Sequence, residues 1–89
     1  MTQNLIITAE VTSVRDIEEI LRDSFRVNFT RSYSNVWQIT EDALQGTAFE
    51  SLEQLMDDLV DALAYQEWEI ELVENIDGQE TIIRAESTN

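Results

Sequence analysis

Residues 68–86 constrain the fold of this chain more than any other stretch. They read WEIELVENI, then DG, then QETIIRAE, so that two segments of largely alternating apolar and polar residues flank Asp77-Gly78. Alternation with a period of two is typical of a β-strand, and Asp-Gly favours the type I′ turn of a two-residue hairpin. Pairing Ile76 with Gln79 then predicts four opposite neighbours: Leu72 with Ile83, Ile70 with Ala85, Glu71 with Arg84, and Val73 with Ile82. We therefore expect an antiparallel hairpin in which Arg84 has Glu71 as its partner.

Three further segments of the chain have strand-like patterns. Residues 4–11 alternate after a short apolar start, and residues 25–32 and 35–40 are rich in β-branched and aromatic side chains. The residues between the last two, around 33–35, have the composition of a turn. The sequence therefore predicts one isolated strand and a second hairpin ahead of the C-terminal one.

Two segments have apolar residues at helical spacing. The first covers about residues 14–24. The second is preceded by Thr47 and Glu50 in a capping-box pattern, which places its first residue near Ala48 and its end near residues 65–66. Both helices have one apolar side, so each must cover a shared surface.

The resulting order is strand, helix, strand, strand, helix, strand, strand. The simplest way to bury the apolar sides of two helices is to pack both helices on one face of an antiparallel sheet. We therefore expect residues 1–89 to form a single α+β domain, a ferredoxin-like βαββαβ arrangement plus an added C-terminal hairpin strand. The order of the strands in the sheet is left open by the sequence.

The composition argues against most enzyme classes. The chain has no cysteine and no histidine, so it lacks disulfides, thiolate nucleophiles, imidazole bases and the usual zinc ligands. Its longest apolar run, residues 5–7, is far too short for a membrane span. We expect a cytoplasmic protein that is not an enzyme, with no catalytic residues, no cofactor and no dedicated metal site.

Charge is the strongest functional signal. The formal net charge is −14, from 19 acids and five arginines, and residues 32–83 contain no basic residue. Such a field repels nucleic acid and anionic membranes and attracts positively charged protein surfaces. We therefore expect a basic protein partner, such as a nucleic-acid-binding protein, with no direct binding to nucleic acid or membrane. Strong self-repulsion favours a monomer.

The second helix concentrates this charge on its solvent side. The acids there are Glu50, Glu53, Asp57, Asp58 and Asp61, and the sequence places no cation near them. Like-charged neighbours at helical spacing destabilise by roughly 0.2–0.5 kcal/mol each, together about 1–2 kcal/mol. That loss in a small domain suggests that the carboxylates are used for binding. A second acidic patch is expected at Glu67, Glu69 and Glu71.

In size and charge the chain resembles the nucleic-acid-mimicking inhibitors of phage and mobile elements, including anti-restriction and anti-CRISPR proteins. That resemblance implies carboxylates that take the place of phosphates on a basic surface. Two alternatives stay open. In one, the acidity serves only solubility or tolerance of high salt. In the other, the chain is a small regulatory adaptor that binds through the sheet face at Val73 and Ile82.

Overall fold

The computed structural model describes residues 2–9, 14–33, 35–63 and 67–87. Its elements, in chain order, are β1 (Thr2–Ala9), α1 (Val14–Glu19), the π-helical turn η2 (Ile20–Ser24), β2 (Thr30–Tyr33), β3 (Val36–Thr40), the 3₁₀ turn η3 (Glu41–Leu44), α2 (Leu52–Ala62), β4 (Trp68–Ile76) and β5 (Gln79–Ser87). Each of the seven expected strands and helices has a counterpart, but the strand predicted at residues 25–32 is in part wrong. β2 begins only at Thr30, because Phe25 and Arg26 still end the first helix and residues 27–29 are not in a strand. The expected ends at residues 10–11 and 64–66 lie outside the described residues.

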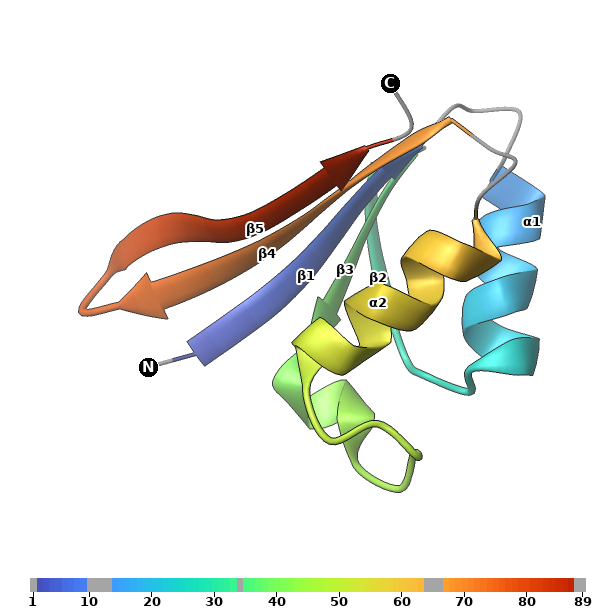
Figure 1. Cartoon of the computed structure of the whole chain (residues 1–89), viewed down its shortest axis with the longest axis horizontal. Coiled ribbons are helices and arrows are strands. Elements are labelled where there is room, and N and C mark those ends of the chain that lie inside the picture. Colours follow the sequence, from blue (N-terminus) through green and yellow to red (C-terminus); the bar gives the residue numbers. More distant parts are fainter. Residues whose placement is uncertain (1, 10–13, 34, 64–66, 88–89) are drawn as a thin grey trace.

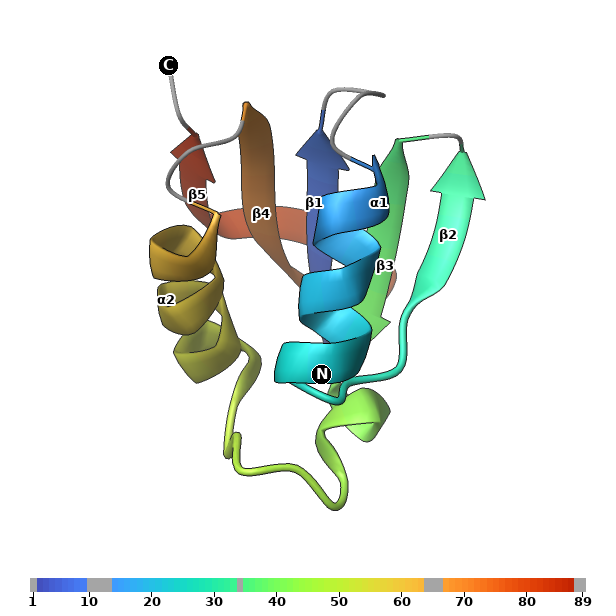
Figure 2. The ribbon, with the colours of Figure 1, turned by 90° about the vertical axis from the view of Figure 1, so that its right-hand side faces the viewer.

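The five strands form one sheet in the order β2-β3-β1-β4-β5, and every neighbouring pair is antiparallel. Both α1 and α2 lie on the same side of this sheet (Figures 1 and 2), and no helix of the described chain covers the other side. The predicted α+β class, with an antiparallel sheet and two helices, is confirmed. The specific ferredoxin-like topology is not confirmed.

The core lies between the sheet and the two helices. In β1, Leu5 lies between Ile39 and Leu72, and Ile7 lies between Trp37 and Ile70, so alternate residues of three strands point to the helices. All six are buried. The helices contribute Ile17, Leu21, Leu52, Leu55, Met56, Leu59 and Leu63 from their apolar sides. The expected apolar sides of both helices are therefore the ones that pack.

The first helix covers the expected residues but changes its winding. After α1 the backbone continues as the π-helical turn η2, and the Phe25 N–H donates to the Ile20 carbonyl, five residues back. Arg26 follows with a φ of 57°, in the left-handed region that glycine or asparagine usually occupies after a helix. The wider turn and the left-handed residue end the helix and lead the chain into β2.

The predicted start of the second helix is wrong by four residues. α2 begins at Leu52, with Ser51 as its N-cap: the Ser51 hydroxyl accepts from the Gln54 N–H, and the Gln54 side chain accepts from the Glu50 N–H. Thr47 instead forms a local turn, donating to the Leu44 carbonyl and accepting from the Phe49 N–H. Both stretches carry a capping pattern, and the one closer to the packed leucines starts the helix.

The C-terminal hairpin follows the predicted register only near its turn. Asp77 and Gly78 have φ values of 53° and 85°, as a type I′ turn requires, and Ile76 pairs with Gln79 as expected. Val73 also pairs with Ile82. Beyond that point the register shifts by one residue, so the observed pairs are Leu72 with Arg84, Glu71 with Ala85, and Ile70 with Glu86.

The predicted pairs of Leu72 with Ile83, Ile70 with Ala85 and Glu71 with Arg84 are therefore wrong. The reason is a β-bulge at Ile83, which has no opposite residue in β4. An extra residue on one strand moves every later side chain of that strand to the other face of the sheet. Arg84 consequently points to the helix side, toward α2.

Candidate functional site: an acidic helix with one arginine beneath it

The carboxylates predicted on the second helix are all exposed. Glu50 precedes the N-cap, and Glu53, Asp57, Asp58 and Asp61 project from α2 into solvent. The opposite side of α2 is anchored in the core by Leu52, Leu55, Met56 and Leu59. A helix held by four buried side chains and a capped N-terminus presents these carboxylates on a fixed backbone.

The expectation that no cation lies near this helix is wrong. The Arg84 guanidinium lies 2.6 Å from Asp57 Oδ1 and 3.8 Å from Glu53 Oε1, and 3.5 Å from Glu86 Oε1. The hydrogen bond to Asp57 is the main reason that the pKa of Arg84 is raised above its ordinary value. The bulge at Ile83 makes this contact possible, because it turns Arg84 to the helix side of the sheet.

Arg84 divides the five carboxylates into two sets. Glu53 and Asp57 share a cation with Glu86, so their mutual repulsion is offset. Glu50, Asp58 and Asp61 have no ion pair within the described ranges. The loss of about 1–2 kcal/mol expected from the sequence is therefore an overestimate. The negative charge available to a partner is greatest at these three side chains.

The second predicted patch lies on the other side of the sheet. In β4, Glu69 pairs with Thr8 of β1, and Glu71 pairs with Ile6. The residues of β1 that alternate with Thr8 and Ile6 enter the core, so the two glutamates point to the opposite side of the sheet. Glu67, one residue before β4, is exposed. The structure does not join this patch to the carboxylates of α2. A shallow hollow of about 270 Å³ adjoins it, lined by Glu69, Glu71, Ala85, Glu86 and Ser87.

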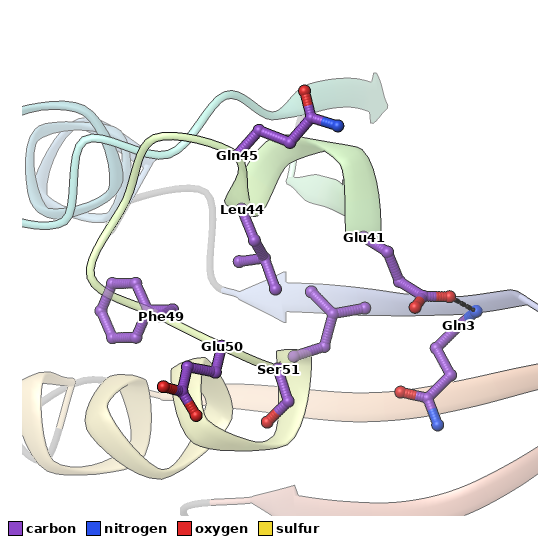
Figure 3. Close-up of a pocket in the computed structure, with 8 residues that line it drawn as sticks. Gln3, Glu41, Leu44, Gln45, Phe49, Glu50 and Ser51 are labelled. Atoms are coloured by element: carbon purple, nitrogen blue, oxygen red, sulfur yellow. Dashed lines mark hydrogen bonds between the residues drawn. The ribbon is translucent and has the colours of Figure 1, made fainter.

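A second hollow, of about 280 Å³, lies where β1, η3 and the start of α2 meet (Figure 3). Leu44 and Phe49 form its apolar wall. Two of its polar groups have partners: Glu41 Oε1 accepts from the Gln3 N–H at 2.6 Å, and the Ser51 hydroxyl accepts from the Gln54 N–H. The first contact joins η3 to β1 and the second caps α2, so the hollow lies at a structural junction.

The apolar surface available to an adaptor on the sheet face also differs from the one expected. Val73 and Ile82 are opposite each other as predicted, but Val73 is only 6% exposed and so offers no contact surface. The exposed aliphatic residues of the hairpin are Ile76, Ile82 and Ile83 instead. Sequence reasoning missed this group because it paired Ile83 with Leu72, which is buried, and no local signal in the sequence marks the bulge.

The arginines other than Arg84 lie in residues 15–31, where four acids balance them. Residues 41–87 carry 14 acids against Arg84 alone, so the charge is segregated along the chain. Among the described residues, no group of three or more histidine, cysteine, aspartate or glutamate side chains is arranged to hold a metal ion. No helix in the described ranges is long and apolar enough to cross a membrane.

Comparisons with protein-family models, with curated proteins and with solved structures found no match to this chain. The functional argument therefore depends on the surface chemistry alone.

Proposed function

We propose that this protein is a non-enzymatic binding protein that docks α2 on a basic surface of another protein, as a nucleic-acid mimic that blocks a DNA- or RNA-binding site. The observation that carries the proposal is the set of exposed carboxylates without an ion pair among the described residues: Asp58 and Asp61 on α2, which is fixed by its buried side, and Glu50 just ahead of its N-cap. We also propose that it works as a monomer in the cytoplasm.

The spacing of the carboxylates suits this role. With a rise of 1.5 Å per residue, Glu53 and Asp61 are about 12 Å apart along the axis of α2, and carboxylates three or four residues apart recur about every 5–6 Å. Phosphates along a nucleic-acid strand come at comparable intervals. A lysine- and arginine-lined channel could therefore exchange phosphate contacts for carboxylate contacts, which favours competition with nucleic acid.

Arg84 supports the same role indirectly. It holds Asp57 and Glu53 on the β5 side of α2, so the charges left for a partner lie on the rest of the helix surface. We therefore assign Arg84 a positioning role and expect the partner to contact Asp58 and Asp61 first.

The test replaces only unpaired carboxylates. The variant Glu50→Gln, Asp58→Asn, Asp61→Asn removes three charges and leaves the Arg84 contacts intact. A matched control, Asp23→Asn, Glu41→Gln, Asp42→Asn, removes three charges from exposed positions outside both α2 and the β4–β5 hairpin. Capture of basic proteins from a lysate, at about 0.05 M and about 0.3 M salt and with duplex DNA as competitor, gives the measurement.

Mimicry predicts that the α2 variant loses the partners that salt and DNA also displace, whereas the control variant keeps most of them. Equal loss in both variants would mean that only the net charge counts. Unchanged capture by the α2 variant would exclude α2 as the binding element.

The ferredoxin-like relationship is also kept as a proposal. It is supported by the position of β1 between β3 and β4, antiparallel to both, with α1 and α2 on one side of the sheet.

An adaptor role is the second candidate function, favoured by the exposed isoleucines of the hairpin, Ile76, Ile82 and Ile83.

A further inference from the structure

The turn end of the β4–β5 hairpin exposes most of the large apolar surface of this protein. Ile76, Ile82 and Ile83 are 50%, 56% and 44% exposed, and in the described residues only Tyr33 is a comparably exposed large apolar side chain. The hairpin extends beyond both helices, so neither covers this end (Figure 1). Ile82 lies opposite Val73, and Ile76 lies three residues from Val73 in β4, so these two side chains point to opposite faces of the hairpin. Of the exposed isoleucines, Ile82 is the one that lies in the regularly paired part of the outer strand β5.

The two outer strands of the sheet differ in their capacity to accept another strand. β2 has four residues, a register irregularity between Arg31 and Tyr33, and the Tyr33 carbonyl already accepts from Arg31 Nε at 3.3 Å. β5 has nine residues and ends the sheet on its other side. Alternate residues of an antiparallel outer strand point their N–H and C=O groups away from the sheet. β5 is therefore the edge strand that is better able to pair with an added strand.

The bulge restricts where such pairing can run. Ile83 interrupts the β5 ladder, and Arg84 beyond it is drawn toward α2 by Asp57. The regular stretch is residues 79–82, whose side chains are all exposed. An added strand beside this stretch would cover Ile82 and leave the contact between Arg84 and α2 intact.

The charge near the turn of the β4–β5 hairpin indicates which kind of partner could bind there. Glu74, Asp77 and Glu80 lie in the same half of the hairpin as the isoleucines, and none has an ion pair in the part of the chain that the structure describes. A second copy of the chain would bring another formal charge of −14 to the same place. Positive charge with aliphatic side chains is complementary instead.

We propose that the outer edge of β5, at residues 79–82, takes up an extended basic and aliphatic segment of a partner protein as a sixth strand. Main-chain hydrogen bonds would give the affinity, and Ile82 with the surrounding acids would give the preference for alternating basic and aliphatic residues. This inference rests on the proposed function in one respect, the basic character of the partner, but it uses a different surface from α2.

The probe is the peptide acetyl-Lys-Val-Lys-Val-Lys-Val-Lys-amide, titrated into the ¹⁵N-labelled protein. Its matched control has three consecutive central residues N-methylated, which removes main-chain donors from both edges and leaves the charge unchanged. We expect the plain peptide to bind at least about tenfold more tightly and to slow amide exchange in residues 79–82. Equal binding of both peptides would overturn the proposal.

Two protein variants complete the test. Ile82→Glu adds negative charge while removing apolar contact, so strand addition predicts at least about tenfold weaker binding, whereas purely electrostatic attraction predicts stronger binding. Tyr33→Glu makes a similar change on β2 and should not weaken binding. Thermal unfolding by circular dichroism checks that both variants fold. A free wild-type protein that sediments as a dimer, and as a monomer after Ile82→Glu, would assign the edge to a second copy and contradict the proposal.

Docking through α2 and strand addition at β5 can be contradicted independently of each other. Peptide signals confined to α2, and lost in the Glu50→Gln, Asp58→Asn, Asp61→Asn variant, would contradict strand addition and leave the proposed function standing. Signals confined to residues 79–82, with lysate capture unaffected by that variant, would support strand addition and contradict docking through α2.

Discussion

Arg26 is the residue whose backbone conformation conflicts most with its side chain. Its φ of 57° lies in the left-handed region, and its side chain is exposed. An L-residue there is destabilised by roughly 1–2 kcal/mol, whereas glycine enters it freely. The chain needs this conformation because the π-helical turn η2 must end abruptly before β2.

Arg26→Gly should therefore raise the free energy of unfolding by about 0.5–1 kcal/mol, the relief of strain minus the extra entropy of glycine in the unfolded chain. Urea unfolding followed by circular dichroism measures it. Arg22→Gly is the matched control: it removes the same side chain inside η2, where glycine should lower stability by about 1 kcal/mol. The same sign for both variants would show that the left-handed backbone is not the cause.

At the level of elements, Arg84 is the link between β5 and α2. It is 28% exposed, whereas the arginine of the Arg15–Glu19 pair on the first helix is 88% exposed. Partial burial and three carboxylate neighbours should make the Arg84 contact with Asp57 stronger than an ordinary surface ion pair. Its position depends on the bulge, which ties the register of the hairpin to the acidic helix.

A double-mutant cycle with Arg84→Gln and Asp57→Asn measures this link. We expect a coupling energy of about 0.5–1 kcal/mol in urea unfolding, against about 0.3 kcal/mol for Arg15→Gln with Glu19→Gln. The Arg84 coupling should shrink as salt is added, because the pair remains accessible to ions. Coupling no larger than that of the control pair would remove the case for Arg84 as a structural link.

For the whole molecule, uneven charge is the dominant property. Residues 41–87 hold 14 of the 19 acids and a single arginine. Arg84 offsets three neighbouring carboxylates, and the others face solvent on both sides of the sheet. We expect such a charge to disfavour association between copies of the chain, and to produce repulsion in the folded state that the unfolded chain relieves.

Stability should therefore rise with ionic strength. Between about 0.01 M and about 0.15 M sodium chloride the screening length falls from about 30 Å to about 8 Å, and we expect the free energy of unfolding to increase by about 1–2 kcal/mol. Urea, which is uncharged, is the suitable denaturant. The Glu50→Gln, Asp58→Asn, Asp61→Asn variant should show a smaller increase. A protein already unfolded in dilute buffer would favour adaptation to high salt instead.

Short-range patterns determined much of this fold. Alternation, β-branched and aromatic content and helical spacing predicted the order of the strands and helices, although β2 begins five residues later than expected. Asp77-Gly78 predicted the turn and the pairs nearest to it. The exposure of the carboxylates on the second helix also follows from its apolar side. These features depend on residues a few positions apart, so the sequence alone is enough to derive them.

Only the tertiary structure decided the features that depend on contacts between distant segments of the chain. Two capping patterns compete ahead of α2, and packing of its leucines selects Ser51 over Thr47. The bulge at Ile83 has no local signal, yet it moves Arg84 from Glu71 to Asp57, on a helix 27 positions earlier in the chain. The physical reason is that a one-residue shift is small in local energy but reverses the side on which every later side chain lies. The acidic helix was therefore evident from its own residues, and the cation beneath it was not.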